Sequence, residues 1–80
     1  MGEEQIEVIL REFGNRAQKE DIGFEELVEE YKEKYNVDIE VVTVELQNAF
    51  VYDYIVVDVG GRKYRINYSS DGFVMSIEEL

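Results

Sequence analysis

Two glycine turns, Gly60-Gly61 and Asp71-Gly72, constrain the fold more than any other feature of the sequence. Two-residue hairpins need positive φ angles, which glycine adopts at little steric cost. A turn at Gly60-Gly61 pairs Ile55 with Ile66, and the second turn pairs the same Ile66 with Ile77. Both hairpins therefore bury one face, whereas a shift of one residue would destroy this agreement. The predicted core side chains of this face are Ile55, Val57, Tyr64, Ile66, Tyr68, Met75 and Ile77.

The segment before these hairpins also alternates with a period of two, which predicts a further strand. A turn centred on Asn48-Ala49 aligns Val42 with Ile55, but Ile39 then falls on the opposite face. A bulge near Val41-Val42 reconciles the two halves. The first or the last strand forms an edge able to pair with a second copy, so a monomer and a homodimer through an edge strand both stay open.

The first half of the chain has apolar residues every three or four positions, which is typical of amphipathic helices. The first predicted helix runs over residues 3–19, or ends earlier at Gly14-Asn15, because glycine inside a helix costs about 1 kcal/mol relative to alanine. The second runs over residues 24–36, where Asn36 suits a left-handed C-terminal position. We therefore predict one α+β domain over residues 1–80, with two N-terminal amphipathic helices packed on a four-stranded antiparallel β-meander.

The order of a helix, a strand and the segment YIVVDVGGRKYRINYSSDGFVMSIEEL resembles that of small PepSY-type domains. These are binding and inhibitory modules built from a helix and a meander sheet. The likeness covers about the last fifty residues and lies in the placement of the turns. It implies a binding or inhibitory role.

The chain contains no cysteine and no histidine. Disulfides and thiolate nucleophiles are therefore excluded, and the commonest general base near neutral pH is missing. We predict a protein that is not an enzyme and has no cofactor or metal site. A carboxylate-dependent hydrolase is the catalytic alternative, with Asp53 as its candidate because the register places this carboxyl among core residues. The simpler interpretation is that Asp53 reaches water or accepts a hydrogen bond from Tyr68.

Nineteen acidic residues against eight basic ones give a net charge of −11. This charge repels nucleic acid and anionic lipid, so we expect no direct nucleic-acid binding and a basic protein as partner. The cluster of Arg62, Lys63 and Arg65 is interpreted as a surface feature. The longest apolar runs have three residues, and the N-terminus is acidic where a signal peptide is basic. We therefore expect a cytoplasmic protein outside the membrane.

Two surfaces are candidate partner-binding sites. On the second helix, Glu25, Glu29 and Glu33 form a row of like charge that mildly destabilises an isolated helix. The row is either a docking face for a basic partner or a solvated surface that maintains solubility. On one strand, three alternating aromatic residues face away from the predicted core, and form either an exposed contact site or a second small core under a helix. The predicted partner-binding residues are Glu25, Glu26, Glu29, Glu30, Glu33, Phe50, Tyr52 and Tyr54.

The leading hypothesis is a small acidic protein-interaction module that binds a basic protein through the acidic helix face or the aromatic sheet face. The alternative is a nucleic-acid-mimicking inhibitor of a DNA- or RNA-binding protein, of the viral or mobile-element type, which occupies a basic groove through charge alone. Salt separates the two hypotheses, because screening abolishes a purely electrostatic contact and weakens an aromatic one much less.

Overall fold

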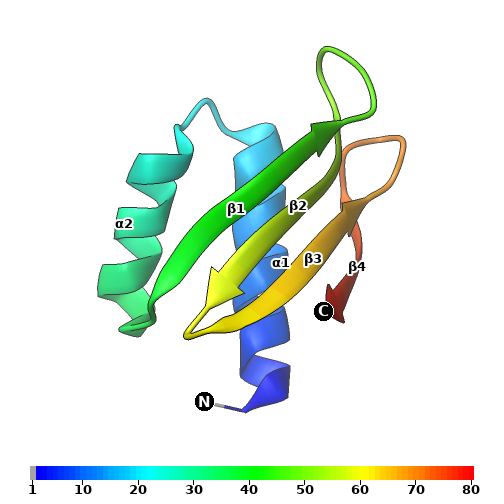
Figure 1. Ribbon diagram of the computed structural model, residues 1–80. Helices are drawn as coiled ribbons and strands as arrows, with labels where there is room; N and C mark the ends of the chain where they lie inside the picture. The colour runs from blue at the N-terminus through cyan, green and yellow to red at the C-terminus, as the bar shows by residue number, and fades with distance from the viewer. Residues whose placement is uncertain (1) are drawn as a thin grey trace.

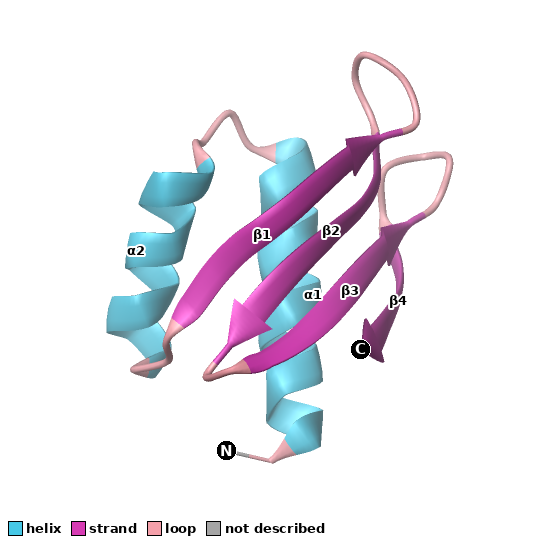
Figure 2. Cartoon of the chain, viewed as in Figure 1, coloured by secondary structure: helices cyan, strands magenta, loops and turns pink. Residues whose placement is uncertain are grey.

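Two helices cover one face of a four-stranded antiparallel sheet in the computed structural model, which describes residues 2–80 apart from the side chain of residue 3 (Figure 1). The sheet order is β1-β2-β3-β4, so strands that are neighbours in sequence are neighbours in space (Figure 2). The predicted α+β fold with a β-meander is confirmed. The elements are α1 (Glu3–Lys19), α2 (Phe24–Tyr35), β1 (Ile39–Leu46), β2 (Tyr52–Val59), β3 (Arg62–Tyr68) and β4 (Val74–Glu79).

Each helix begins and ends within one residue of its predicted range and buries apolar side chains on one face. α1 continues through Gly14 to Lys19, so the alternative end at Gly14-Asn15 is wrong. α2 ends before Asn36, whose φ of 52° and ψ of 47° are left-handed as predicted. The side chains that the helices contribute to the core are those of Ile9, Leu10, Phe13, Ala17, Leu27 and Tyr31.

The β2–β3 hairpin has the register that its glycine turn predicts. Ile55 pairs with Ile66, and Gly60 and Gly61 have φ angles of 61° and 91°. Ile66 also pairs with Ile77, so both hairpins share one inner face. Within the sheet the buried members of this face are Ile39, Ile55, Val57, Tyr64, Ile66, Tyr68 and Val74, and Ile77 is partly buried against them.

The β3–β4 connection departs from the predicted two-residue turn. Tyr68 pairs with Val74 and not with Met75. Val74 is buried, whereas Met75 is 63% exposed, so the prediction that Met75 belongs to the core is wrong. The Ser69 N–H donates to the Phe73 carbonyl at 2.8 Å and the Gly72 N–H donates to the Ser69 carbonyl at 3.0 Å, so the turn has one residue more than predicted. The register shift that follows places Met75 on the outside.

β1 contains the predicted bulge. Its pairing with β2 shifts between Val41 and Thr43, and Val42 is the additional residue. Val44 therefore lies opposite Ile55, so the predicted pairing of Val42 with Ile55 is wrong. The bulge leaves both Val41 and Val44 on the helix side of the strand, because their partners across the ladder belong to the buried face.

A polar cluster joins the two helices. Arg16 of α1 binds Glu20, with Nε 2.9 Å from Oε2, and also forms an ion pair with Glu30 of α2. The Tyr31 hydroxyl donates a hydrogen bond of 2.5 Å to Oε1 of Glu12. The Arg16 guanidinium lies 5.6 Å from the centre of the Tyr31 ring. These contacts fix α2 against α1 and therefore set its position beside the sheet.

We expect the stabilisation that this cluster provides to decrease as the pH falls. The Arg16 guanidinium lowers the pKa of the Glu20 and Glu30 carboxyls below the ordinary value of 4.5, and the Tyr31 hydroxyl lowers the pKa of Glu12. A lowered pKa in the folded state stabilises the fold above the unfolded-state pKa, and this contribution is lost as the pH falls through the folded-state pKa. The gap in urea midpoint between the wild type and Arg16→Met should therefore be largest near pH 7 and shrink toward about pH 3.

The gap is the quantity to measure because acidification also relieves the self-repulsion of a chain with a net charge of −11. That relief affects both proteins almost equally and cancels in the comparison. A gap that stays constant or widens on acidification would contradict the assignment of these carboxylates to the interhelical cluster.

Candidate functional site

The sheet face opposite the helices is covered by polar side chains. The Arg65 guanidinium lies 4.0 Å from the centre of the Tyr54 ring, and Arg65 Nε donates to Oδ1 of Asn67 at 2.9 Å. Asn67 in turn donates to Glu78 of β4 at 2.8 Å. Lys63 and Asp58 lie opposite each other in the β2–β3 ladder and form a cross-strand ion pair. This network leaves Tyr54 half-buried and makes the open face a poor apolar docking surface.

The predicted aromatic strip does not form one surface. Phe50 lies in the β1–β2 loop with 85% of its surface exposed, and Tyr54 lies on the open face. Tyr52 points to the helix side, where its ring centre is 5.9 Å from that of Phe24 and 5.5 Å from that of Tyr68. The prediction that Tyr52 shares a face with Tyr54 is therefore wrong.

Gln18 of α1 explains why Tyr52 turns inward. Its side-chain amide donates to the Phe50 carbonyl at 2.8 Å and accepts from the Tyr52 N–H at 2.8 Å. The pairing of β1 with β2 shifts at this point, and Asp53 is the additional residue. Asp53 is exposed, so its predicted place among the core residues is wrong and the simpler interpretation, that this carboxyl reaches water, is confirmed. The hydrolase hypothesis loses the buried carboxyl on which it rested.

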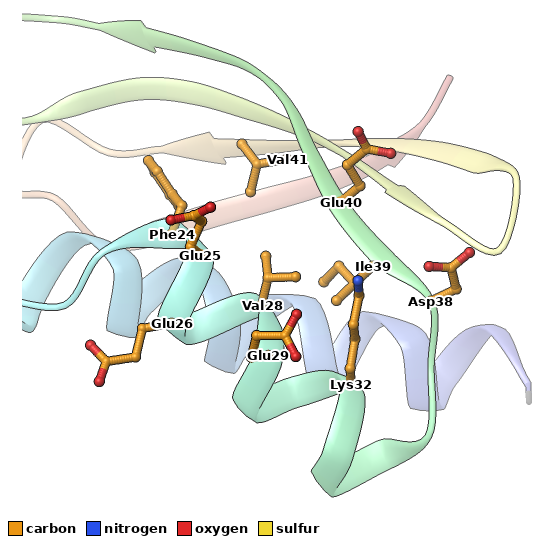
Figure 3. Close-up of a pocket in the computed structure, with 10 residues that line it drawn as sticks. All are labelled: Phe24, Glu25, Glu26, Val28, Glu29, Lys32, Asp38, Ile39, Glu40 and Val41. Atoms are coloured by element: carbon orange, nitrogen blue, oxygen red, sulfur yellow. The ribbon is translucent and has the colours of Figure 1, made fainter.

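A groove lies between α2 and the edge strand β1 (Figure 3). Its volume is about 700 Å³. The floor is apolar and comes from Phe24 and Val28 of α2 and from Ile39 and Val41 of β1. The remaining lining residues are five acids and one base, namely Glu25, Glu26, Glu29, Asp38, Glu40 and Lys32.

The sequence builds this groove from two simple periods. Phe24 and Val28 are four residues apart and share a helix face, and the glutamates that follow each of them lie one position further round the helix. Ile39 and Val41 are two residues apart and share a strand face. The apolar sides of both elements meet, and the charged neighbours are left at the opening. An apolar floor with an acidic rim results.

The predicted acidic residues divide between this groove and other places. Glu25, Glu26 and Glu29 line the groove. Glu30 faces α1, where it pairs with Arg16, and Glu33 is exposed outside the groove. The contributions of Asp38 and Glu40, and the whole apolar floor, were not predicted from the sequence. The change from helical to alternating period around residue 37 was the available signal, because it places a strand directly after α2.

The rim carries uncompensated negative charge. Within the described part of the chain, none of its five carboxylates forms an ion pair, and Lys32 is the one basic residue among the lining side chains. Like charges that surround a low-dielectric floor concentrate the local potential. The arrangement favours a ligand that carries positive charge next to apolar groups.

A second depression of about 490 Å³ continues beyond the N-terminal end of α2. Phe24 lines both depressions, and Val44, Leu46 and Phe50 extend the apolar surface along the β1–β2 hairpin. These three side chains are 36%, 56% and 85% exposed. The apolar side of β1 is therefore covered by α2 in its first half and is open in its second half.

Comparison with family models, with curated proteins and with solved structures finds no match to this chain. The resemblance to PepSY-type domains therefore stays a likeness in turn placement. In the described residues, no helix is long and apolar enough to cross a membrane. The same residues contain no group of three or more His, Cys, Asp or Glu side chains placed to hold a metal ion.

Proposed function

We propose that this protein is a small cytoplasmic protein-interaction module that binds a basic protein partner in the groove between α2 and β1. The observation that carries the proposal is the combination of an apolar floor with five acidic side chains and a single lysine around it. A solvated surface needs the charges for solubility, but it does not need the half-buried apolar side chains of Phe24, Val28 and Val41 between them.

The proposal retains the acidic helix face and sets aside the aromatic sheet face. Three of the predicted glutamates line the groove, whereas Tyr52 and Tyr54 lie on opposite sides of the sheet. The expected ligand is a segment in which lysine or arginine alternates or mixes with aliphatic residues. Its charges contact the rim, which speeds association and sets specificity, and its apolar side chains reach the floor.

Charge reversal at the rim tests this assignment. Glu29→Lys removes one attraction and adds one repulsion, so we expect it to weaken binding of a basic-apolar peptide by about three- to tenfold. Glu33→Lys is the matched control, because it lies on the same helix outside the groove and changes the net charge equally. It should alter the affinity by less than about twofold. Fluorescence anisotropy with a labelled peptide of alternating Lys and Val measures both.

Equal effects of the two substitutions would mean that only the overall charge is sensed, and the groove would then not be the site. Salt gives a second readout. Because the floor is apolar, part of the affinity should persist at high ionic strength, where a nucleic-acid mimic acting by charge alone would lose nearly all of its binding.

A further inference from the structure

We propose that the partner segment binds as a fifth strand on the free edge of β1, over the part of α2 that extends past the sheet. This inference rests on the proposed function and specifies the form of its ligand: an extended basic-apolar segment that adds to the sheet through backbone hydrogen bonds.

The backbone of β1 is the first observation. Asp38 accepts a hydrogen bond from the Gly60 N–H, and Glu40 pairs with Asp58 across the β1–β2 ladder. Backbone groups in an antiparallel strand alternate in direction, so those of Ile39 and Val41 point away from β2. Among the described residues, the backbone of Ile39–Leu46 makes no hydrogen bond apart from its pairing with β2. One side of an eight-residue strand is therefore free to pair.

The opposite edge of the sheet gives a contrast within the same molecule. On β4, the Val74 N–H donates to Oδ1 of Asn15 at 2.9 Å, and the Val74 carbonyl accepts from Arg11 at 3.2 Å. Side chains of α1 thus occupy the outward groups of that edge at its N-terminal end. Proteins commonly block edges in this way to prevent unwanted pairing. β1 has no such block within the residues described.

The position of α2 supports the same conclusion. In Figure 1, α2 lies beside β1 at the margin of the sheet, whereas α1 lies behind the sheet. The side chains of Phe24 and Val28 are only half-buried and line the groove next to the strand edge. A strand added to β1 would continue the sheet across this face, and every second side chain of it would contact the groove floor.

The negative charge of β1 and the rim favours a basic segment as the added strand and argues against a second copy of this chain. β1 itself reads IEVVTVEL and has two glutamates and no basic residue. Pairing β1 with β1 of another molecule would bring these glutamates beside a second acidic rim, in a protein with a net charge of −11. Like charges directly opposite each other destabilise strand pairing. A lysine- or arginine-bearing segment relieves the same rim charge.

Backbone methylation of the ligand tests strand addition directly. The probe is a fluorescein-labelled eight-residue peptide of alternating Lys and Val, compared with two versions that are N-methylated either at every valine or at every lysine. Side-chain charge is the same in all three. Since N–H groups of a strand alternate in direction, only one methylated version loses the hydrogen bonds to β1, and we expect it to bind at least about tenfold more weakly. The other should keep its affinity within about threefold.

The outcomes distinguish failure of groove binding from failure of strand addition. If the unmethylated peptide does not bind, or if Glu29→Lys has no effect on it, the proposed function is wrong. If it binds in a manner that depends on Glu29 but both methylated versions bind equally well, strand addition is overturned and the groove assignment stands. A complex that contains two copies of the chain without peptide, measured by light scattering, would support self-pairing at the edge and also overturn the inference.

Discussion

Tyr31→Ala is expected to remove about 3–5 kcal/mol from the free energy of unfolding, the range found when a large buried aromatic residue is truncated. Tyr31 is 0% exposed and is among the largest fully buried side chains of the described residues. Its ring packs edge to face on Phe13, with the centres 5.4 Å apart. Removing it leaves a cavity where α1 and α2 meet.

The same substitution also affects the polar cluster above the ring. Glu12 loses the hydroxyl that donates to it, and Arg16 loses the ring beneath its guanidinium. A domain of this size has a total stability of about 4–12 kcal/mol, so the loss removes a large share of it. We expect a urea midpoint shifted far downward and a domain that is partly unfolded at physiological temperature.

Tyr31→Phe is the matched control because it keeps the ring and removes the hydroxyl alone. It should cost about 1.5–3 kcal/mol at most, the contribution of a hydrogen bond to a charged group. If the alanine variant were no less stable than the phenylalanine variant, the ring would not be the centre of the helix–helix contact. Because α2 forms one wall of the groove, the alanine variant should also lose peptide binding.

The parts of the fold that were predictable depend on local chemistry. The Gly60-Gly61 turn fixes the β2–β3 register because both glycines adopt positive φ angles, and this turn conformation depends only on the local sequence. The two helices follow from apolar spacing within each segment. The left-handed Asn36 follows in the same way, because the apolar spacing of the second helix ends just before it.

The parts that were not predictable depend on contacts between distant segments. Tyr52 turns inward because Gln18, 34 residues earlier, holds the backbone of the β1–β2 loop. Val74 replaces Met75 in the core at the point where Asn15, 59 residues earlier, binds the Val74 amide. Each contact accompanies a register shift, and each shift exchanges the inside and outside of the residues beyond it. No periodicity in the sequence indicates such a hydrogen bond between a helix side chain and a distant backbone group.

The candidate site was likewise predictable only in its local features. The negative charge of the second helix was visible in the sequence, whereas the groove required knowledge of where that helix docks. The Arg16–Glu30 ion pair settles this, because it turns one of the predicted glutamates toward α1 and leaves Glu25 and Glu29 beside β1. The proposed binding surface is therefore a consequence of helix–helix packing, and its disruption should follow from changes in the core.

Gly14→Val is expected to destabilise the protein by about 3 kcal/mol or more, through overpacking at the contact between α1 and the sheet. A Cβ atom at Gly14 would lie 2.7 Å from Cγ2 of Val74 and 2.9 Å from Cγ2 of Ile66. The Gly14 carbonyl also accepts a hydrogen bond of 2.6 Å from the buried Tyr68 hydroxyl. The glycine that suggested a helix end is thus the residue that lets the helix backbone approach the sheet.

The stability of Gly14→Ala should lie between those of the wild type and Gly14→Val, because the gain of about 1 kcal/mol in helix propensity opposes an overpacking cost of about 1–3 kcal/mol. Gly23→Ala is the control, since a Cβ there has nothing within 4 Å and should change stability by less than about 1 kcal/mol. Urea unfolding followed by circular dichroism measures all three variants. If Gly14→Ala were more stable than the wild type, α1 would have room to move away from the sheet. The close approach at Gly14 would then not determine the position of α1. It would also not determine the position of α2 and the groove, which depend on α1 through Arg16 and Tyr31.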